Sequence, residues 1–387
     1  MPDGDRSIGA GTAGPHRPGR VLRLLGVLLA VLLAVVVLVV WTARGGPERA
    51  AAPGTAPAAT APASTSPPTT HQASRRAVAG PPVASPECSA PGRQWVTRYA
   101  GSWTERINDP EPPADRTYDL RRLRHVGYGS ATMYAITIAN PSSGWTSSRS
   151  CVLGGEVRSS VDRGRRWADL EENYNGDALD VGIASDWAVV DGLRADNVFD
   201  AIAAQGPTDT RLVVRNVWLS DIRDDCIEND HQPKSLTVVD SLLDGCFTGI
   251  SQRPDEEDPQ PRPGAGAVTL LDGVLLYVKP QAFGTDCQYA QACGDGRAAF
   301  NLFKWSASAT PRVVIRNSVL RVDRYSAWGP SEMGFPPGTR ASNSVLVWLG
   351  PGRFPAPVPA GMRVTSDPSV WERARARWLC RHGNGAC

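Results

Sequence analysis

A short strand-like segment recurs along the middle of the chain, and this repeat constrains the fold more than any other sequence feature. It is found as WAVVDG, LVVRNV, LTVVDS, VTLLDG and VVIRNS, and each copy carries a polar residue after alternating apolar positions. The polar residues follow one another at steps of 25, 24, 32 and 45 residues: Asp191, Asn216, Asp240, Asp272 and Asn317. Period-two alternation predicts strands with one buried face. The residues predicted to point inward are Val189, Val214, Val238, Leu270 and Ile315, and two positions earlier Trp187, Leu212, Leu236, Val268 and Val313.

A second repeated column follows the early copies. It reads DALDVG, DAIAAQ, DCIEND and TGISQR, and its third residue is always a large aliphatic, at spacings of 23, 25 and 23 residues: Leu179, Ile202, Ile227 and Ile250. Strands that recur about every 24 residues without a helical period predict a solenoid, in which each repeat is one coil. Equivalent residues of neighbouring coils then stack about 4.8 Å apart. We therefore predict an all-β fold, a parallel β-helix.

Longer steps and the chain end require additional elements. We expect loops at 252–266 and 284–297, the second closed by a disulfide between Cys287 and Cys293. Residues 88–176 are expected to form the N-terminal cover and the first coils. The segment DPSVWERARARWLC predicts an amphipathic helix that covers the last coil, with Trp371, Ala374 and Trp378 on one face. A second disulfide, between Cys380 and Cys387, is expected to hold the tail.

The N-terminal part predicts export and membrane anchoring. Residues 24–41 are apolar or small and uncharged, which is long enough to span a bilayer, and four arginines precede them. We expect a cytoplasmic segment at 1–23, a transmembrane anchor at 24–41, a disordered Pro/Ala/Thr/Ser-rich linker at 42–87 and an extracytoplasmic domain at 88–387. A cleaved signal peptide is the alternative. The predicted location is the cell membrane, crossed once.

Cysteine content and charge narrow the classes of function. All eight cysteines follow the apolar run, and an even number in an exported chain favours disulfides. Zinc is the alternative, although no Cys-x-x-Cys pair occurs. The formal net charge of +2 gives no indication of a nucleic-acid partner.

Stacking brings several carboxylates together. Asp177, Asp200 and Asp225 occupy one column on successive coils, Asp224 adjoins the last of them, and a neighbouring column holds Asp180 and Glu228. Like charges about 5 Å apart raise one another's pKa, so that one acid can stay protonated beside an ionised one. Hydrolysis of a glycosidic bond needs such a pair. The strip therefore predicts a polysaccharide site.

A resemblance to a known family rests on the segment DDCIEN, Asp224 to Asn229. It resembles the Asp-Asp-Cys-Ile-Ala-Ile/Val motif of polygalacturonases, right-handed parallel β-helix enzymes of the pectin-lyase-like superfamily. That family has a further aspartate one coil earlier, in Asn-Thr-Asp, where this chain has Asp200 after Val198 and Phe199. One coil later the family has Gly-His-Gly-Ile/Leu-Ser, and here Thr248 replaces the histidine. The resemblance covers residues 177 to 251.

The resemblance implies a right-handed β-helix, a disulfide between Cys226 and Cys246, and acid and base roles for Asp200, Asp224 and Asp225. His231, six residues past Asp225, is a candidate to replace the missing histidine. The family's Arg-Ile-Lys motif has no convincing match, and Lys279 is the nearest candidate.

Other interpretations stay open for these residues. Asp177 and Asp180 could hold calcium together with other acids of the strip. The candidates for substrate binding are Glu228, which belongs to the strip, and Arg223 and Arg253, which flank it. The structural alternative is that the two arginines only pair with neighbouring acids. The polar residues of the first column fit hydrogen-bond ladders without chemistry.

Three functions follow as hypotheses. The first is an exported, membrane-anchored glycoside hydrolase of polygalacturonase-like, inverting type. The second is a calcium-dependent polysaccharide lyase, and the third is a non-catalytic protein that binds a glycan or the cell wall. In each case the expected partner is a polysaccharide or cell-wall glycan, with the membrane bound through the N-terminal helix. Calcium is the one cofactor that the residues suggest.

Overall fold

The computed structural model describes residues 86–130, 132–139, 148–207, 209–230, 234–253, 266–282, 298–306 and 310–383. They belong to one compact unit, Arg75–Cys387. No helix within these ranges has the length and apolar content needed to cross a membrane. The predicted cytoplasmic segment, the predicted span at 24–41 and the linker as far as residue 85 lie outside the described residues.

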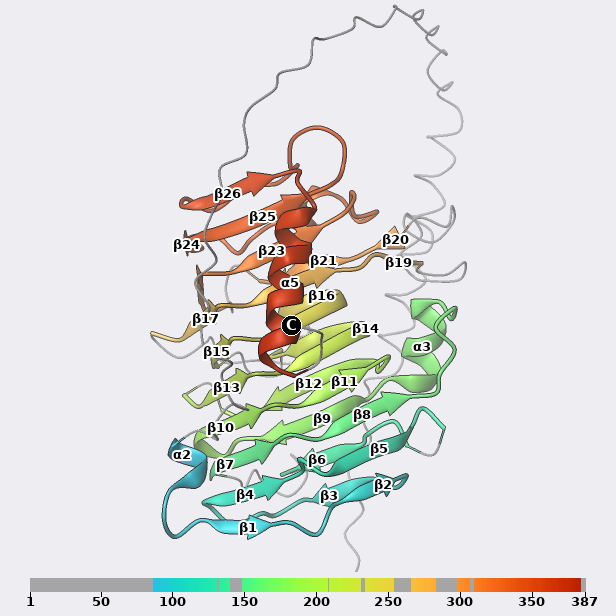
Figure 1. The fold of residues 1–387 in the computed structure, drawn as a ribbon, viewed down its shortest axis with the longest axis vertical. Coiled ribbons are helices and arrows are strands. Elements are labelled where there is room, and N and C mark those ends of the chain that lie inside the picture. Colours follow the sequence, from blue (N-terminus) through green and yellow to red (C-terminus); the bar gives the residue numbers. More distant parts are fainter. Residues whose placement is uncertain are drawn as a thin grey trace, which may run out of the picture. The chain divides into compact units, whose positions relative to one another are not determined.

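The described chain winds through stacked parallel strands (Figure 1). The strands form three rows, and strands of one row pair in parallel with those of the coils before and after. The first row consists of β1 (Gln94–Val96), β4 (Arg116–Asp119), β7 (Ser148–Leu153), β10 (Ser185–Asp191), β13 (Arg211–Arg215), β15 (Ser235–Val239), β17 (Val268–Asp272), β22 (Arg312–Arg316) and β24 (Arg340–Ser342).

The second row begins after a short turn in each coil. It consists of β2 (Gly101–Trp103), β5 (Leu123–Tyr128), β8 (Glu156–Ser159), β11 (Arg194–Asp196), β14 (Trp218–Glu228), β16 (Leu242–Gln252), β18 (Leu275–Val278), β23 (Val319–Val322), β25 (Ser344–Trp348) and β26 (Met362–Thr365). Strands β14 and β16 are long enough to continue into the third row. That row also contains β3 (Ile107–Asp109), β6 (Ile136–Ile138), β9 (Asp177–Gly182), β12 (Asp200–Gln205) and β21 (Asn301–Trp305).

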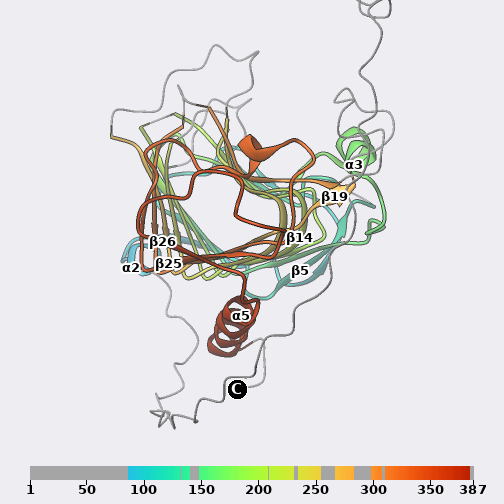
Figure 2. The same ribbon diagram turned by 90° about the horizontal axis from the view of Figure 1, so that it is seen from above.

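Seen along the stack, successive coils overlie one another around a closed outline (Figure 2). Aliphatic side chains fill the interior, and Leu179, Ile202, Ile227 and Ile250 are all fully buried there. A short antiparallel pair, β19 (Gln281–Ala282) and β20 (Ala298–Ala299), projects beside the stack. The fold is thus an all-β solenoid of parallel strands, compatible with the predicted β-helix.

The predicted register of the second column is confirmed. Leu179 pairs with Ile202, Ile202 with Ile227, and Ile227 with Ile250. Because strands on neighbouring coils keep this register, Asp200 pairs with Asp177 and lies beside Asp225.

The predicted register of the first column is wrong at two strands. Asp191 pairs with Arg215 rather than with Asn216, and Asp272 pairs with Arg316 rather than with Asn317. The equivalent turn positions, all at positive φ, are instead Gly192, Asn216, Asp240, Gly273 and Asn317. A glycine, an asparagine or an aspartate tolerates this left-handed conformation, so the turn residue alone was a misleading anchor.

A slip of one residue moves every side chain of a strand to the other face. Trp187, Val189, Val268 and Leu270 therefore do not point into the core as predicted. The buried positions are Ala188, Val190, Thr269 and Leu271, each at most 1% exposed. On the outside, Trp187 and Val189 pack in a small cluster with the Cys88–Cys151 disulfide, and the guanidinium of Arg93 lies over the Trp187 ring.

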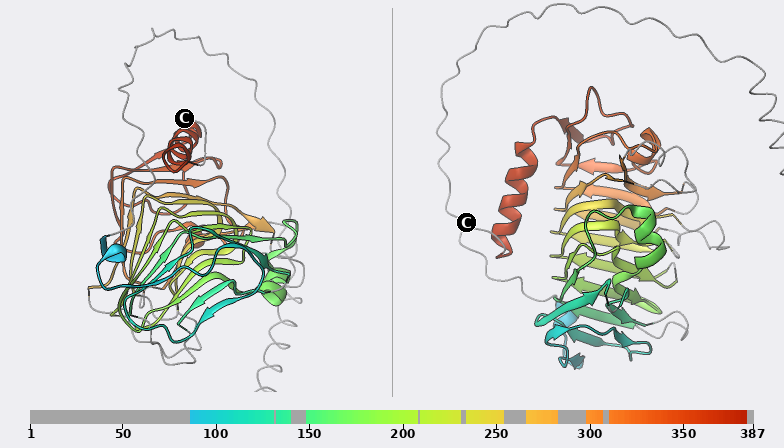
Figure 3. Two further views of the ribbon diagram at one scale, coloured as in Figure 1. Left: turned by 60° about the horizontal axis from the view of Figure 1, so that its bottom comes forward. Right: turned by 90° about the vertical axis from the view of Figure 1, so that its right-hand side faces the viewer.

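The predicted C-terminal helix forms as α5 (Ser369–Arg381), and it buries Trp371, Ala374 and Trp378 as expected. Its position differs from the prediction, because it lies along the outer face of the second row rather than over the last coil (Figure 3, right). There its apolar face packs against aliphatic residues that point outward from the strands: Leu242, Leu275 and Val347.

The disulfide implied by the resemblance is present. Cys226 and Cys246 are bonded, and they join β14 to β16 in the core. A bond between Cys88 and Cys151, not predicted as a pair, ties helix α2 (Pro86–Ser89) to β7. Cys380 is also disulfide-bonded. Its predicted partner Cys387, like Cys287 and Cys293, lies outside the described residues.

Candidate functional site

A cavity of 570 Å³ opens over the third row of strands. Its floor comes from five successive coils, because β9, β12, β14, β16 and β21 all contribute residues to it. The column that begins with Asp177, Asp200 and Asp225 continues through Thr248, which pairs with Asp225, and Asn301, which pairs with Thr248. All five residues line the cavity.

An irregularity in β14 brings two neighbouring carboxyl groups into this cavity. The pairing of β14 with β16 shifts register between Ile222 and Asp225. A regular strand turns successive side chains to opposite faces, whereas Asp224 and Asp225 both line the cavity. Carboxylate oxygens of Asp200, Asp224 and Asp225 lie within 4.8 Å of one another. The sequence therefore places the acids correctly, and the shift explains how adjacent aspartates share one site.

Burial changes the protonation of the cluster. Loss of hydration raises the pKa of Asp200 and of Asp224 well above the usual range, and neighbouring carboxylates add to this effect. The same causes raise the pKa of Asp177 and Glu228. Burial also raises the pKa of Asp225, but only to about 6, because Lys304 opposes the effect. The pKa of Asp225 thus lies below neutrality, beside acids whose pKa values are raised by burial and by like charge.

Lys304 is a site residue that the sequence reasoning did not assign. Its Nζ lies 3.0 Å from Oδ2 of Asp230 and 3.9 Å from Oδ2 of Asp225. Burial lowers the pKa of this ammonium, yet the surrounding carboxylates outweigh burial and raise it well above the ordinary value. The signal was present: Lys304 follows the buried Phe303 as Glu228 follows Ile227, and it pairs with Ser251 in the same column. The long insertion before β21 hid this relationship.

Aromatic side chains form one side of the cavity. Trp167 begins helix α3 (Trp167–Tyr174), which is inserted between β8 and β9. Its ring stacks on Phe247 at 5.9 Å and lies 6.0 Å from Phe199. Trp328, just before the short helix η2 (Pro330–Met333), contacts Phe247 edge-on at 5.3 Å. All four rings line the cavity.

The remaining predicted residues separate into two groups. Glu228 and Arg253 line the cavity. Arg223 lies in a second, smaller cavity together with Lys279. Asp180 is buried, and burial raises its pKa to about 7. It is not among the described residues that line the main cavity. His231 lies outside the described residues.

Two sets of carboxylates have the geometry to hold a hard cation. Oxygens of Asp177, Asp200 and Glu228 lie within 4.8 Å of one another, as do those of Asp200, Asp224 and Asp225. Carboxylate oxygens are the ligands that calcium prefers. Of the two residues predicted for calcium, Asp177 belongs to one of these sets, and Asp180 belongs to neither.

Comparisons of the chain with protein-family models, with curated proteins and with solved structures found no match.

Proposed function

We propose that the protein hydrolyses glycosidic bonds of a polysaccharide in the cavity above Asp200, Asp224 and Asp225. The observation that carries the proposal is the close grouping of these three carboxyl groups, whose pKa values are raised, with Nζ of Lys304 3.9 Å from Oδ2 of Asp225. Glycoside hydrolysis uses one carboxylic acid, which protonates the leaving oxygen, and one carboxylate, which acts as base or nucleophile. The environments of the three aspartates separate their pKa values in this way.

The roles follow from the charges. Asp225, ionised at neutral pH beside Lys304, serves as the base that removes a proton from water. Asp224, whose pKa is raised well above the usual range, serves as the acid that protonates the leaving oxygen. Asp200 accepts the Asp225 backbone N–H through Oδ1 and holds the pair in position. The bond from the anomeric carbon to the leaving oxygen breaks as water supplies the new oxygen.

The spacing bears on stereochemistry. The oxygens lie within 4.8 Å of one another, closer than the roughly 6.5–9.5 Å typical of inverting enzymes and nearer to the roughly 5–5.5 Å of retaining ones. Direct attack by the water that Asp225 activates would invert the anomeric carbon, whereas this short spacing favours a route in which Asp225 attacks that carbon and water then releases the sugar with retention. The configuration of the first product is measured by proton NMR.

A glycan suits the rest of the cavity. Flat aromatic rings such as Trp167 and Trp328 offer apolar faces for sugar rings. On the floor, the buried Oδ1 of Asn301 has no hydrogen-bond partner in the described part of the chain, so it is available to a ligand hydroxyl. The resemblance of DDCIEN to the polygalacturonase motif and the parallel solenoid also support the proposal. The histidine of that motif is absent, and Lys304 supplies positive charge instead.

The predicted anchor and linker extend the proposal to location. An apolar span at 24–41 followed by a Pro/Ala/Thr/Ser-rich linker would hold the solenoid outside the membrane, where polysaccharides are encountered.

A calcium-dependent lyase is the second candidate, and the three-carboxylate set of Asp177, Asp200 and Glu228 favours it. The test is to incubate the full chain with acidic and neutral polysaccharides, with and without a chelator. Hydrolysis releases reducing ends without ultraviolet absorbance and survives chelation. Unsaturated, absorbing ends that require calcium would establish the lyase instead. Retention of glycan without any product would leave a binding protein and contradict both.

A further inference from the structure

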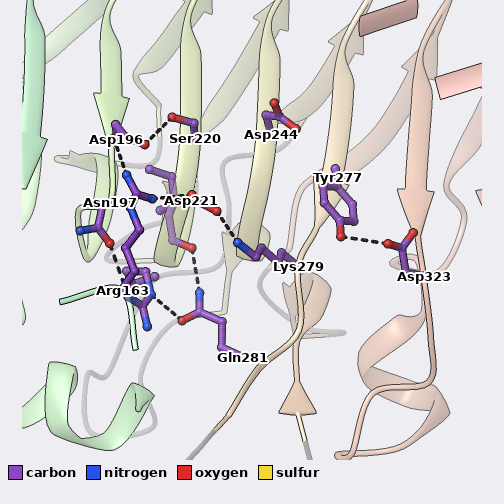
Figure 4. A network of polar contacts seen from close by, with 12 residues as sticks. Arg163, Asp196, Asn197, Ser220, Asp221, Asp244, Tyr277, Lys279, Gln281 and Asp323 are labelled. Carbon is purple, nitrogen blue, oxygen red and sulfur yellow. Dashed lines mark hydrogen bonds and ion pairs between the residues drawn. The ribbon is translucent and has the colours of Figure 1, made fainter. Parts of the chain in front are cut away.

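A second cavity, of 210 Å³, lies beside β14 and is rich in positive charge. Four cationic side chains and one carboxylate line it: Arg163, Arg165, Arg223 and Lys279, with Asp221. This cavity is separate from the acidic cavity, although the two are adjacent in sequence, because Arg223 directly precedes Asp224. Figure 4 shows side chains of this region meeting from several coils, with Lys279 and Arg163 on either side of Asp221.

The guanidinium of Arg223 is the central feature of this cavity. Arg223 is only 7% exposed, and it donates to Oε1 of Gln281 at 2.7 Å, to Oδ1 of Asn197 at 3.4 Å and to the carbonyl oxygen of Arg165 at 2.6 Å. All three acceptors are neutral. No carboxylate forms an ion pair with Arg223 in the ranges that the structure describes. Asp221 and Asp162 favour its charge from a distance, but a buried charge is costly when no carboxylate is in direct contact with it.

The single lining carboxylate is already shared. Asp221 pairs with Arg163 through one oxygen and with Lys279, at 2.5 Å, through the other. Arg163 also contacts Oδ2 of Asp196 at 2.6 Å. Arg165 pairs with Asp169 at 2.7 Å. Among the described residues, Arg223 is thus the lining cation without an ion pair, and Arg163 and Lys279, whose side chains are about half exposed, can turn toward a ligand.

The partners of Arg223 are themselves fixed. Gln281 donates its amide to the carbonyl oxygen of Ile222 at 3.0 Å, and Asn197 donates to that of Val161 at 2.7 Å. Because these bonds orient the two side chains, the guanidinium is held in place before any ligand arrives. Preorganised donors of this kind reduce the entropy lost on binding.

We propose that this cavity is an oxyanion-binding site for a carboxylate, sulfate or phosphate group. Arginine offers a planar set of donors that matches such groups, and charge-assisted hydrogen bonds are the stronger ones. The group is either a free inorganic anion or an anionic substituent of a glycan, since both present the same oxygens. The proposed anion site does not depend on hydrolysis in the acidic cavity, and measurements of anion binding alone can support or overturn it.

The test is isothermal titration calorimetry of the full chain with sodium sulfate and with sodium phosphate at constant ionic strength. A second arm uses a uronate oligosaccharide and its carboxyl-reduced form. Saturable binding of an inorganic anion identifies the free ion as sufficient, whereas binding of the uronate form alone identifies a glycan substituent. Binding in neither arm overturns the proposal.

Variants locate the site. Arg223→Gln is expected to abolish binding, and Lys279→Gln and Arg163→Gln are each expected to weaken it about tenfold. Arg211→Gln, which changes an exposed arginine on β13, is the matched control and should bind like the unchanged protein. Circular dichroism and thermal unfolding check each fold. If Arg223→Gln fails to fold, the two exposed cations decide, because unchanged affinity in both would overturn the proposal.

Discussion

The backbone N–H of Asp225 donates a hydrogen bond of 2.8 Å to Oδ1 of Asp200. This bond joins two consecutive coils at the point where their carboxyl groups meet, and both residues are at most 5% exposed. Asp200 is thereby held against Asp225. A fixed geometry of this kind is what catalysis by preorganised groups requires.

Removing the proposed base should stop hydrolysis. Asp225→Asn keeps the backbone N–H that Asp200 accepts but cannot take a proton from water, so kcat should fall by about 10²–10⁴-fold. Release of reducing ends measures the effect. Asp209→Asn, an exposed change outside the cavity, is the control. Activity of Asp225→Asn close to that of the control would contradict the assigned role.

The pH at which hydrolytic activity rises, the acidic limb of the pH–activity profile, should depend on Lys304. Hydrolysis requires ionised Asp225, whose pKa is raised to about 6 by burial and held there by Lys304. Activity should therefore rise with pH through about 6. Lys304→Met removes the opposing charge, and the limb should move upward by about one pH unit. Lys304→Arg keeps the charge and should leave the limb near its original position. An unshifted limb in Lys304→Met would refute the link.

The burial of Asp180 should make stability depend on pH. Its folded-state pKa is about 7, above the ordinary 3.8, so the folded state holds the proton more tightly than the unfolded chain does. The free energy of unfolding should therefore decrease as pH rises from about 4 to 7. Asp180→Asn removes this titration and should stabilise the protein at pH 7 by about 2–4 kcal/mol, with little effect at pH 4.

Urea unfolding of the unchanged protein and of Asp180→Asn at both pH values gives the difference directly. Asp209→Asn again serves as a control, because its side chain is exposed. The same stabilisation at pH 4 and pH 7 would show that something other than the buried charge is responsible.

Trp167 should contribute to glycan affinity rather than to the chemical step. Its ring lines the cavity and stacks on Phe247, so Trp167→Ala should weaken substrate binding about tenfold, which corresponds to about 1.4 kcal/mol. Trp187→Ala changes an aromatic residue outside the cavity and is the matched control. A fall in kcat with unchanged KM would argue against a stacking role.

The third row of strands could be predicted because its pattern is self-consistent. Leu179, Ile202, Ile227 and Ile250 are large aliphatics at nearly constant spacing, and their register carries Asp177, Asp200 and Asp225 with it. A buried aliphatic ladder strongly fixes register, because a slip would expose it.

The first row could not be predicted as well, since polar residues and glycines alternate at its turns. Asp191 precedes Gly192 at the turn, whereas Asn216 occupies the turn itself. Several residues around the cavity were missed for a different reason. Trp167 and Lys304 reach it from an inserted helix and from a strand behind a long insertion, and repeat spacing does not extend across such segments. Apolar periodicity predicted helix α5, but it carried no information about which surface the helix would meet.

Helix α5 affects how the solenoid unfolds. A stack in which each coil touches only its neighbours can fray one turn at a time from an open end. Here Arg375 bonds Asp244, and the indole of Trp378 donates to the carbonyl oxygen of Asp240. These contacts span more than 130 residues of sequence and fasten the end of the chain to a coil near its middle. The coils between them should resist peeling individually and melt together as one cooperative block.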